Sequence, residues 1–155
     1  MNKTEFVLLF NREIRKLQNE VEAYPNDDQM WAVVPGTINS GGNLVQHLIG
    51  NLRTYIGLTL GNVPYVRNRD AEFGERLFTK ESFLIEINNL AQITESSLIR
   101  LSDKDLRKEY SKDVLAMFPD QTVGIVLTHL LIHLGYHMGQ INYHRRFTAS
   151  LPEGL

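Results

Sequence analysis

Residues 120–146 read DQTVGIVLTHLLIHLGYHMGQINYHRR and hold four of the five histidines of the chain: His129, His133, His137 and His144. An α-helix turns by about 100° per residue, so spacings of four, four and seven residues keep these imidazoles on one helix face. Apart from histidine, residues 123–142 carry no ionisable charge, which predicts a long helix that is central to the fold. Imidazoles four residues apart lie side by side and can bind one metal ion. Buried imidazoles without any partner would be costly, and a metal ion is one way to pair them.

Three earlier segments repeat apolar residues at intervals of three and four, the spacing that predicts amphipathic helices: residues 3–22, 41–60 and 79–101. The polar, turn-rich residues 61–78 predict a long connection between the second and third of these helices. A connection of that length allows a crossover, in which the third helix runs parallel to the second. Together with the histidine-bearing helix, the pattern predicts an all-α fold, a four-helix bundle in a single domain over residues 1–155.

Two finer features are also predicted. Gly50 and Gly57 give the second helix a flat strip where another helix can approach closely. Residues 114–118 (VLAMF) predict a short hairpin with residues near Tyr110, just before the last helix.

The composition narrows the class of protein. Of the 155 residues, 43% are hydrophobic and 22% are charged, as in ordinary globular domains. A net charge of −2 without a basic cluster gives no electrostatic reason to expect a nucleic-acid partner. The last helix is long enough to cross a bilayer, but its histidines, Gln140 and Asn142 would be expensive in lipid, so no membrane partner is expected. The charged amphipathic start predicts no signal peptide, and we expect a cytoplasmic protein.

Several catalytic motifs are absent from the sequence. Leu134, Gly135 and Tyr136 separate the central histidines, so the chain lacks the HExxH motif of zinc proteases. No Glu-x-x-His occurs, which disfavours a di-iron carboxylate bundle. Phosphate-binding loops, dinucleotide fingerprints and nucleophile elbows are also missing. The chain has no cysteine, so any thiol chemistry would need a thiol brought in from outside.

Spacing alone leaves the role of the histidines open. A metal site, a hydrogen-bonded row of imidazoles, and haem or other ligation all fit the pattern. By geometry His129–His133 is as good a pair as His133–His137. His47, on the apolar face of the second helix, can supply a third ligand from a neighbouring helix, although a single histidine is more often a hydrogen-bonded core or surface residue. Three protein ligands leave coordination positions for water or substrate, as in catalytic sites.

Gln140 follows His137 by three residues and returns to the same helix face. It is expected either to orient a ligand or to touch substrate. An ordinary polar residue at the point where the helix leaves the core is the alternative.

The stretch HLLIHLGYHMGQINYHRR resembles the closing helix of the DinB-like (YfiT-like) metal-binding four-helix bundles. Those proteins carry an HxxxHxGQ pattern, which here spans residues 133–140, and a histidine in their second helix, which matches His47 within NLVQHLIGNLR. Residues 67–73 (RNRDAEF) are similar to the loop that follows the second helix in one branch of the family.

The resemblance implies a divalent metal ion, such as zinc, nickel or iron, held by His47, His133 and His137. It leaves His129 and His144 as flanking or second-shell residues, and it implies a homodimer. Characterised relatives include S-transferases and isomerases that use low-molecular-weight thiols such as bacillithiol or mycothiol, and others have been proposed as metal-dependent hydrolases. We therefore expect a metal-dependent enzyme with thiol-dependent S-transferase or hydrolase activity on a small-molecule substrate. A non-catalytic bundle in which the ion is structural is the alternative.

Overall fold

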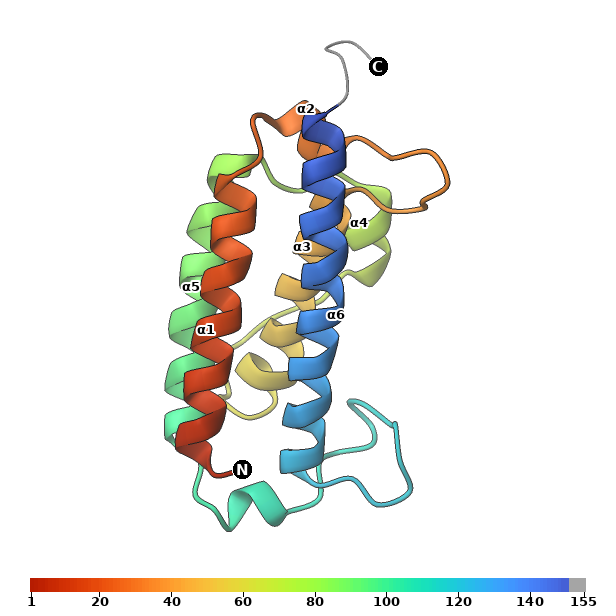
Figure 1. Ribbon diagram of the computed structural model, residues 1–155. Helices are drawn as coiled ribbons and strands as arrows, with labels where there is room; N and C mark the ends of the chain where they lie inside the picture. Colours follow the sequence, from red (N-terminus) through yellow and green to blue (C-terminus); the bar gives the residue numbers. More distant parts are fainter. Residues whose placement is uncertain (151–155) are drawn as a thin grey trace.

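The computed structural model describes residues 1–150, and over that range the chain is all-helical and contains no β-strand (Figure 1). The elements in chain order are α1 (Lys3–Glu22), α2 (Asp27–Trp31), α3 (Gly41–Leu52), the π-helical turn η1 (Arg53–Leu58), α4 (Arg69–Gly74), α5 (Lys80–Ile99), the 3₁₀ turn η2 (Asp105–Arg107) and α6 (Val123–Ala149). The all-α prediction is confirmed.

Short polar side chains cap the four long helices at their N-termini. Asn2, Ser40, Thr79 and Thr122 each accept a hydrogen bond from the backbone N–H three residues further on. Such caps satisfy N–H groups that have no partner within the helix. The local sequence thus sets where α1, α3, α5 and α6 begin.

The long helices lie side by side, with α1 and α6 running in one direction and α3 and α5 in the other (Figure 1). At one end of the α1–α5 pair the Lys3 ammonium donates to the Ile99 carbonyl, and at the other end the Lys80 ammonium donates to the Tyr24 carbonyl. The connection from η1 to α5 returns along the molecule, so α3 and α5 are parallel, an arrangement that a connection of that length allows. Apolar side chains from every long helix meet in one core, and the residues with at most 1% exposure include Phe10, Leu17, Leu48, Phe83, Leu90, Leu130 and Leu134.

The most deeply buried helix is α3 and not α6. Every residue of α3 is buried, because α4, α5 and α6 all pack against it. By contrast, Ile132, Tyr136 and Tyr143 of α6 are each more than 60% exposed. The uncharged sequence of α6 therefore overstated how central this helix is.

Two helix predictions need correction. The regular second helix ends at Leu52 and continues as the π-helical turn η1, whereas hydrophobic spacing predicted one helix to residue 60. The connection after it contains α4, a helix of only 6 residues. Such a short helix carries too few apolar repeats to be recognised from periodicity.

The predicted hairpin of residues 114–118 with Tyr110 is wrong. The Tyr110 N–H donates instead to the Gln121 carbonyl, and one isolated bridge joins Glu109 to Thr122. Residues 114–118 form a loop that the Gln121 side chain closes, since its amide accepts from the Met117 N–H and donates to the Tyr110 carbonyl. A buried amide therefore satisfies backbone groups that a second strand would have paired.

The two predicted close-approach glycines have different neighbours. Gly57 faces α5, where an added Cβ would lie 2.9 Å from Ile93 Cγ2, as expected for close helix packing. Gly50 faces the Glu72 carboxylate of α4, and its role belongs to the site described below.

None of the helices within residues 1–150 combines the length and the apolar character needed to cross a lipid bilayer.

Candidate metal centre

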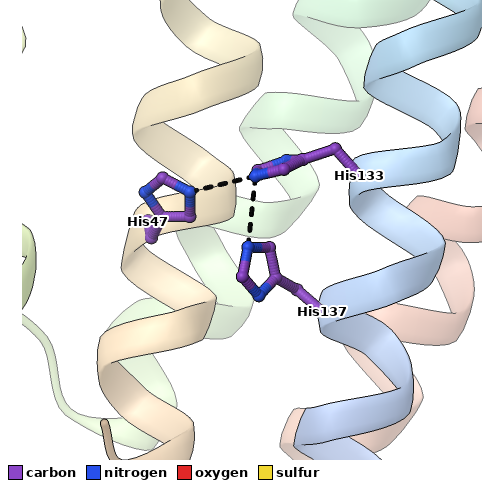
Figure 2. Close-up of side chains that lie close together, drawn as sticks. All are labelled: His47, His133 and His137. Carbon is purple, nitrogen blue, oxygen red and sulfur yellow. Dashed lines mark hydrogen bonds between the residues drawn. The ribbon is translucent and has the colours of Figure 1, made fainter. Parts of the chain in front are cut away.

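Three imidazoles from two antiparallel helices converge at the α3–α6 contact (Figure 2). His47 extends from α3, and His133 and His137 extend from successive turns of α6. His133 Nε2 lies 3.3 Å from His47 Nε2 and 3.1 Å from His137 Nε2. One ring nitrogen from each residue lies within 4.8 Å of the other two. The structure thus brings together the three histidines that the family resemblance selected.

A buried carboxylate fixes the orientation of the His47 ring. Glu72 Oε2 lies 2.9 Å from His47 Nδ1, on the side of the ring away from the other imidazoles. The glutamate is only 3% exposed, and Arg67 binds both of its oxygens, with Nε 2.7 Å from Oε1 and Nη2 2.8 Å from Oε2. A side chain at Gly50 would collide with this carboxylate. Glycine is therefore required at that turn of α3 for Glu72 to reach His47.

Polar side chains of α3 hold α4 in place. The Asn43 amide donates to the Glu72 carbonyl at 3.1 Å, and the Gln46 amide donates to the carbonyls of Ala71, Glu72 and Glu75. These bonds add partners to carbonyls at the C-terminal end of a short helix, where the Ala71 carbonyl also accepts from the Glu75 N–H. Through them the backbone of α4 is tied to the same face of α3 that carries His47.

His137 is oriented by a residue of its own helix. Gln140 Oε1 accepts a hydrogen bond from His137 Nδ1 at 2.6 Å, and Gln140 Nε2 donates to the Tyr136 hydroxyl at 3.3 Å. Of the two sequence interpretations of Gln140, the structure agrees with an orienting role.

These outer contacts determine where the protons lie. His47 Nδ1 lies closer to Glu72 Oε2, at 2.9 Å, than to the donor Arg67 Nη2, at 3.3 Å. A carboxylate only accepts hydrogen bonds, so the shorter contact places the His47 proton on Nδ1, and the carbonyl oxygen of Gln140 requires the same of His137. Both Nε2 atoms therefore direct lone pairs at His133 Nε2. A single proton on His133 Nε2 can satisfy only one of them, whereas a cation at the centre accepts all three lone pairs.

The nitrogen spacing also fits a metal ion. With zinc–nitrogen bonds of about 2.0–2.1 Å, two ligands of a tetrahedral ion lie about 3.3 Å apart. The two separations from His133 Nε2, 3.1 and 3.3 Å, are close to this value, and all three ring nitrogens lie within 4.8 Å of one another. Three neutral imidazoles are a donor set suited to zinc, nickel or iron. The residues present therefore fit a divalent ion.

Burial keeps His133 and His137 in the neutral form that metal ligation requires. For His133, burial and then the neighbouring imidazoles of His137 and His47 lower the pKa to about 4. Burial also lowers the pKa of His137, although the hydrogen bond to Gln140 acts in the opposite direction. The second ring nitrogen of His133, Nδ1, is buried and has no hydrogen-bond partner among residues 1–150. His133 thus lacks the outer partner that His47 and His137 both have.

The Glu72 carboxylate, paired with Arg67, lies behind His47. Burial alone raises the pKa of the Glu72 carboxyl, but hydrogen bonds from Arg67 and His47 outweigh this and hold the pKa below its usual range. Glu72 is therefore ionised at neutral pH. Its charge makes His47 a stronger electron donor toward a cation on the opposite side of the ring.

The remaining two histidines of α6 lie outside the cluster. The half-buried ring of His129 stacks on His133 at 6.1 Å between centroids, and it makes no hydrogen bond with the three converging imidazoles. His144 is far along the helix, where Nδ1 lies 2.7 Å from the Tyr24 hydroxyl and Nε2 lies 2.8 Å from the Ala32 carbonyl. His144 thus joins α6 to the turn after α1 and to the segment after α2. Its hydrogen bonds are not to the three converging imidazoles, whereas His129 lies beside His133.

Sequence reasoning missed Arg67 and Glu72. Residues 67–73 were noted only for their resemblance to a family loop, with no role for either side chain. A physical signal was present, because a buried metal-binding histidine usually donates its second N–H to a carboxylate or a carbonyl. The connection that follows α3 contains carboxylates, among them Asp70 and Glu72.

The chain belongs to a family described as proteins of unknown function, DUF1572, whose model matches residues 5–150. No curated protein and no solved structure matches the chain.

Proposed function

We propose that this protein is a divalent-metal-dependent enzyme of the DinB-like group, with its ion held by His47, His133 and His137. One observation carries the proposal: three imidazole nitrogens converge, and two of the rings are locked by outer hydrogen bonds with their lone pairs pointing inward. The place of DUF1572 in the DinB/YfiT-like clade supports it, as does the arrangement of four long helices with a parallel α3 and α5. We accordingly propose a four-helix bundle with a crossover connection.

Three protein ligands favour a catalytic ion over a purely structural one. Structural zinc sites are closed by four protein ligands, whereas catalytic sites retain a position for water or substrate. When bound, a divalent ion supplies a Lewis acid that polarises substrate oxygen or sulfur and favours loss of a proton from a thiol or water. Within residues 1–150, no fourth histidine, cysteine or carboxylate joins the cluster.

The residues of the chain have separate roles around that ion. His47, His133 and His137 bind it as neutral donors. Glu72 accepts a hydrogen bond from the His47 Nδ1–H, Arg67 forms an ion pair with Glu72, and the Gln140 carbonyl accepts a hydrogen bond from the His137 Nδ1–H. No side chain of the cluster is a nucleophile, so the attacking group must come from a small molecule.

We propose S-transfer from an external low-molecular-weight thiol to a small electrophile, or hydrolysis, as the class of reaction. The chain has no cysteine of its own, which agrees with a thiol co-substrate. Activity with an added thiol and without it distinguishes the two reactions. The homodimer implied by the resemblance remains a proposal, and light scattering of the intact protein tests it.

Elemental analysis of untagged protein, purified without chelator or nickel resin, tests the proposal most directly. We expect about one divalent ion per chain in the wild type and a loss of at least tenfold in the His133→Ala variant. The His129→Ala variant is the matched control and retains the metal. Protein that carries no metal, and that binds none when zinc, nickel or iron is added, would refute the proposal.

A structural ion is the second candidate. His47 is 6% exposed and its partner Glu72 is 3% exposed, so the site is embedded where α3, α4 and α6 meet. An ion there would stabilise the folded state by mass action. Chelation that lowers the melting temperature sharply, in a protein with no turnover in either metal state, would favour this candidate.

A further inference from the structure

A second feature of the molecule adjoins the histidine cluster. The segment of residues 33–40 lies beside the C-terminal half of α6 and forms with it an open cavity of about 540 Å³, several of whose lining residues are exposed. Leu44 and Gln140 line this cavity. Leu44 precedes His47 by about one turn of α3, and Gln140 follows His137 by about one turn of α6. The cavity therefore lies directly next to the layer of the fold that contains the converging imidazoles.

The lining of the cavity is apolar and uncharged. Its walls include Val34, Ile38, Leu44, Tyr143 and Phe147, and none of the described residues that line it is an aspartate, glutamate, lysine or arginine. Its one histidine, His144, has both ring nitrogens engaged by Tyr24 and Ala32. An ionic ligand would find no formal counter-charge in this lining.

The size of the cavity fits a small molecule. Ligand sites are concave, mostly apolar, and have volumes of roughly 300–1,000 Å³ with a few polar groups that fix orientation. Gln140 is such a group, because it lines the cavity and its carbonyl also accepts a hydrogen bond from the His137 Nδ1–H. It connects whatever fills the cavity to a ligand of the proposed metal ion.

A larger cavity, of about 650 Å³, lies at the other end of α6, but it is less suited to this role. Its lining includes Asp103 and Arg107, and it approaches the cluster only through His129. His129 makes no hydrogen bond with the three converging imidazoles. The contact through Gln140 is therefore the more direct of the two.

We infer that the cavity between residues 33–40 and α6 binds the uncharged, apolar part of the substrate, and that Leu44, Tyr143 and Phe147 determine which substrates fit. The inference rests on the proposed function in one respect, namely that the reaction takes place at the histidine cluster. Binding in the cavity itself does not depend on a metal ion, so the two can be tested separately.

Nuclear magnetic resonance of the intact, metal-free protein tests binding, with indole as the probe and indole-3-acetate as its anionic counterpart. We expect indole to shift the Gly36 amide and the Gln140 side-chain amide while leaving the Gly124 amide of the larger cavity unchanged. Indole-3-acetate is expected to bind several-fold more weakly. A shift at Gly124 instead, or no shift at millimolar indole, would overturn the inference.

Two variants remove part of the cavity wall at exposed positions where folding is not at risk. Phe147→Ala and Tyr143→Ala change side chains that are 48% and 75% exposed, and the control Ile132→Ala changes one that is 67% exposed and lines the larger cavity. We expect the first two to weaken indole binding by about tenfold and the control to leave it unchanged. Equal effects in all three variants would contradict the assignment. A second copy of the chain filling this cavity would also contradict it, and would appear as concentration-dependent shifts of Gly36 without indole.

A further experiment with added metal ions tests whether a molecule bound in the cavity lies close to the histidine cluster. Paramagnetic Co²⁺ at the cluster should speed the relaxation of bound indole protons relative to diamagnetic Zn²⁺, and this difference should vanish in His133→Ala. Indole that binds but is unaffected by bound Co²⁺ would show a cavity unrelated to the site and would overturn the inference. Protein that binds neither ion would refute the proposed function, and the cavity would then be judged on the binding experiment alone.

Discussion

Replacing Glu72 by glutamine gives the sharpest test of how the fold supports the histidine cluster. Glutamine has the shape of glutamate, but it lacks the charge and offers one acceptor oxygen where the carboxylate offers two. In the wild type, Glu72 accepts hydrogen bonds from His47 Nδ1 at 2.9 Å and from two Arg67 nitrogens at 2.7 and 2.8 Å. In Glu72→Gln an amide NH₂ must face either Arg67 or His47, which places a donor against a donor.

This substitution is expected to change both the metal affinity and the folding stability. Loss of an outer-shell partner typically weakens metal affinity by about 10–100-fold, which corresponds to about 1.4–2.8 kcal/mol. Removing one member of a buried ion pair leaves the other charge unpaired and costs about 3 kcal/mol of folding stability or somewhat more. The Arg67 side chain retains 14% exposure, so water offsets part of the second cost.

The assay is competition for zinc against a chromophoric chelator, combined with urea unfolding of the metal-free protein. The matched control is Glu13→Gln, because Glu13 is 8% exposed and pairs with Arg12 and Lys16 but lies on α1, away from the cluster. We expect Glu72→Gln alone to weaken zinc binding at least tenfold. If both variants bind zinc as the wild type does, Glu72 does not orient His47 and the reasoning fails.

Further predictions concern two glycines, Gly50 and Gly139, and the buried histidine His144. Gly50→Ala should weaken zinc binding and lower the free energy of unfolding, because the new Cβ would collide with Glu72 Oε1. The control is Gly139→Ala, which has open space around it and should raise the free energy of unfolding by about 0.5–1 kcal/mol in urea unfolding. His144 is buried, and burial lowers its pKa despite the hydrogen bond to the Ala32 carbonyl. The folded state then binds fewer protons than the unfolded state, so stability is complete above the unfolded pKa of about 6.5 and is lost as pH falls below it. His144→Gln should therefore show a smaller loss of stability between pH 7.5 and 5.5 than wild type in chelator-treated protein, and equal losses would contradict the assignment.

Much of the fold follows from local sequence. Apolar repeats at three and four residues predicted the helices, and the caps Ser40, Thr79 and Thr122 begin three of them at the residues expected from their chemistry. The length of the connection before α5 allowed a crossover, and the structure shows α3 and α5 to be parallel. The pairing of His133 with His137 is also local, because residues four apart on one helix are neighbours whatever surrounds that helix.

Only the tertiary structure decided which imidazoles meet. Helical spacing places His129 and His144 on the same face of α6 as His133 and His137. One face of a long helix, however, contacts different neighbours at different positions along its axis. At the level of His133 and His137 the neighbour is α3, which provides His47. One end of α6 reaches Tyr24 and the segment after α2, where His144 becomes a buried hydrogen-bonding residue. The Arg67–Glu72 pair likewise depends on α4 folding back onto α3 at Gly50, a contact between residues distant in sequence that no periodic pattern encodes.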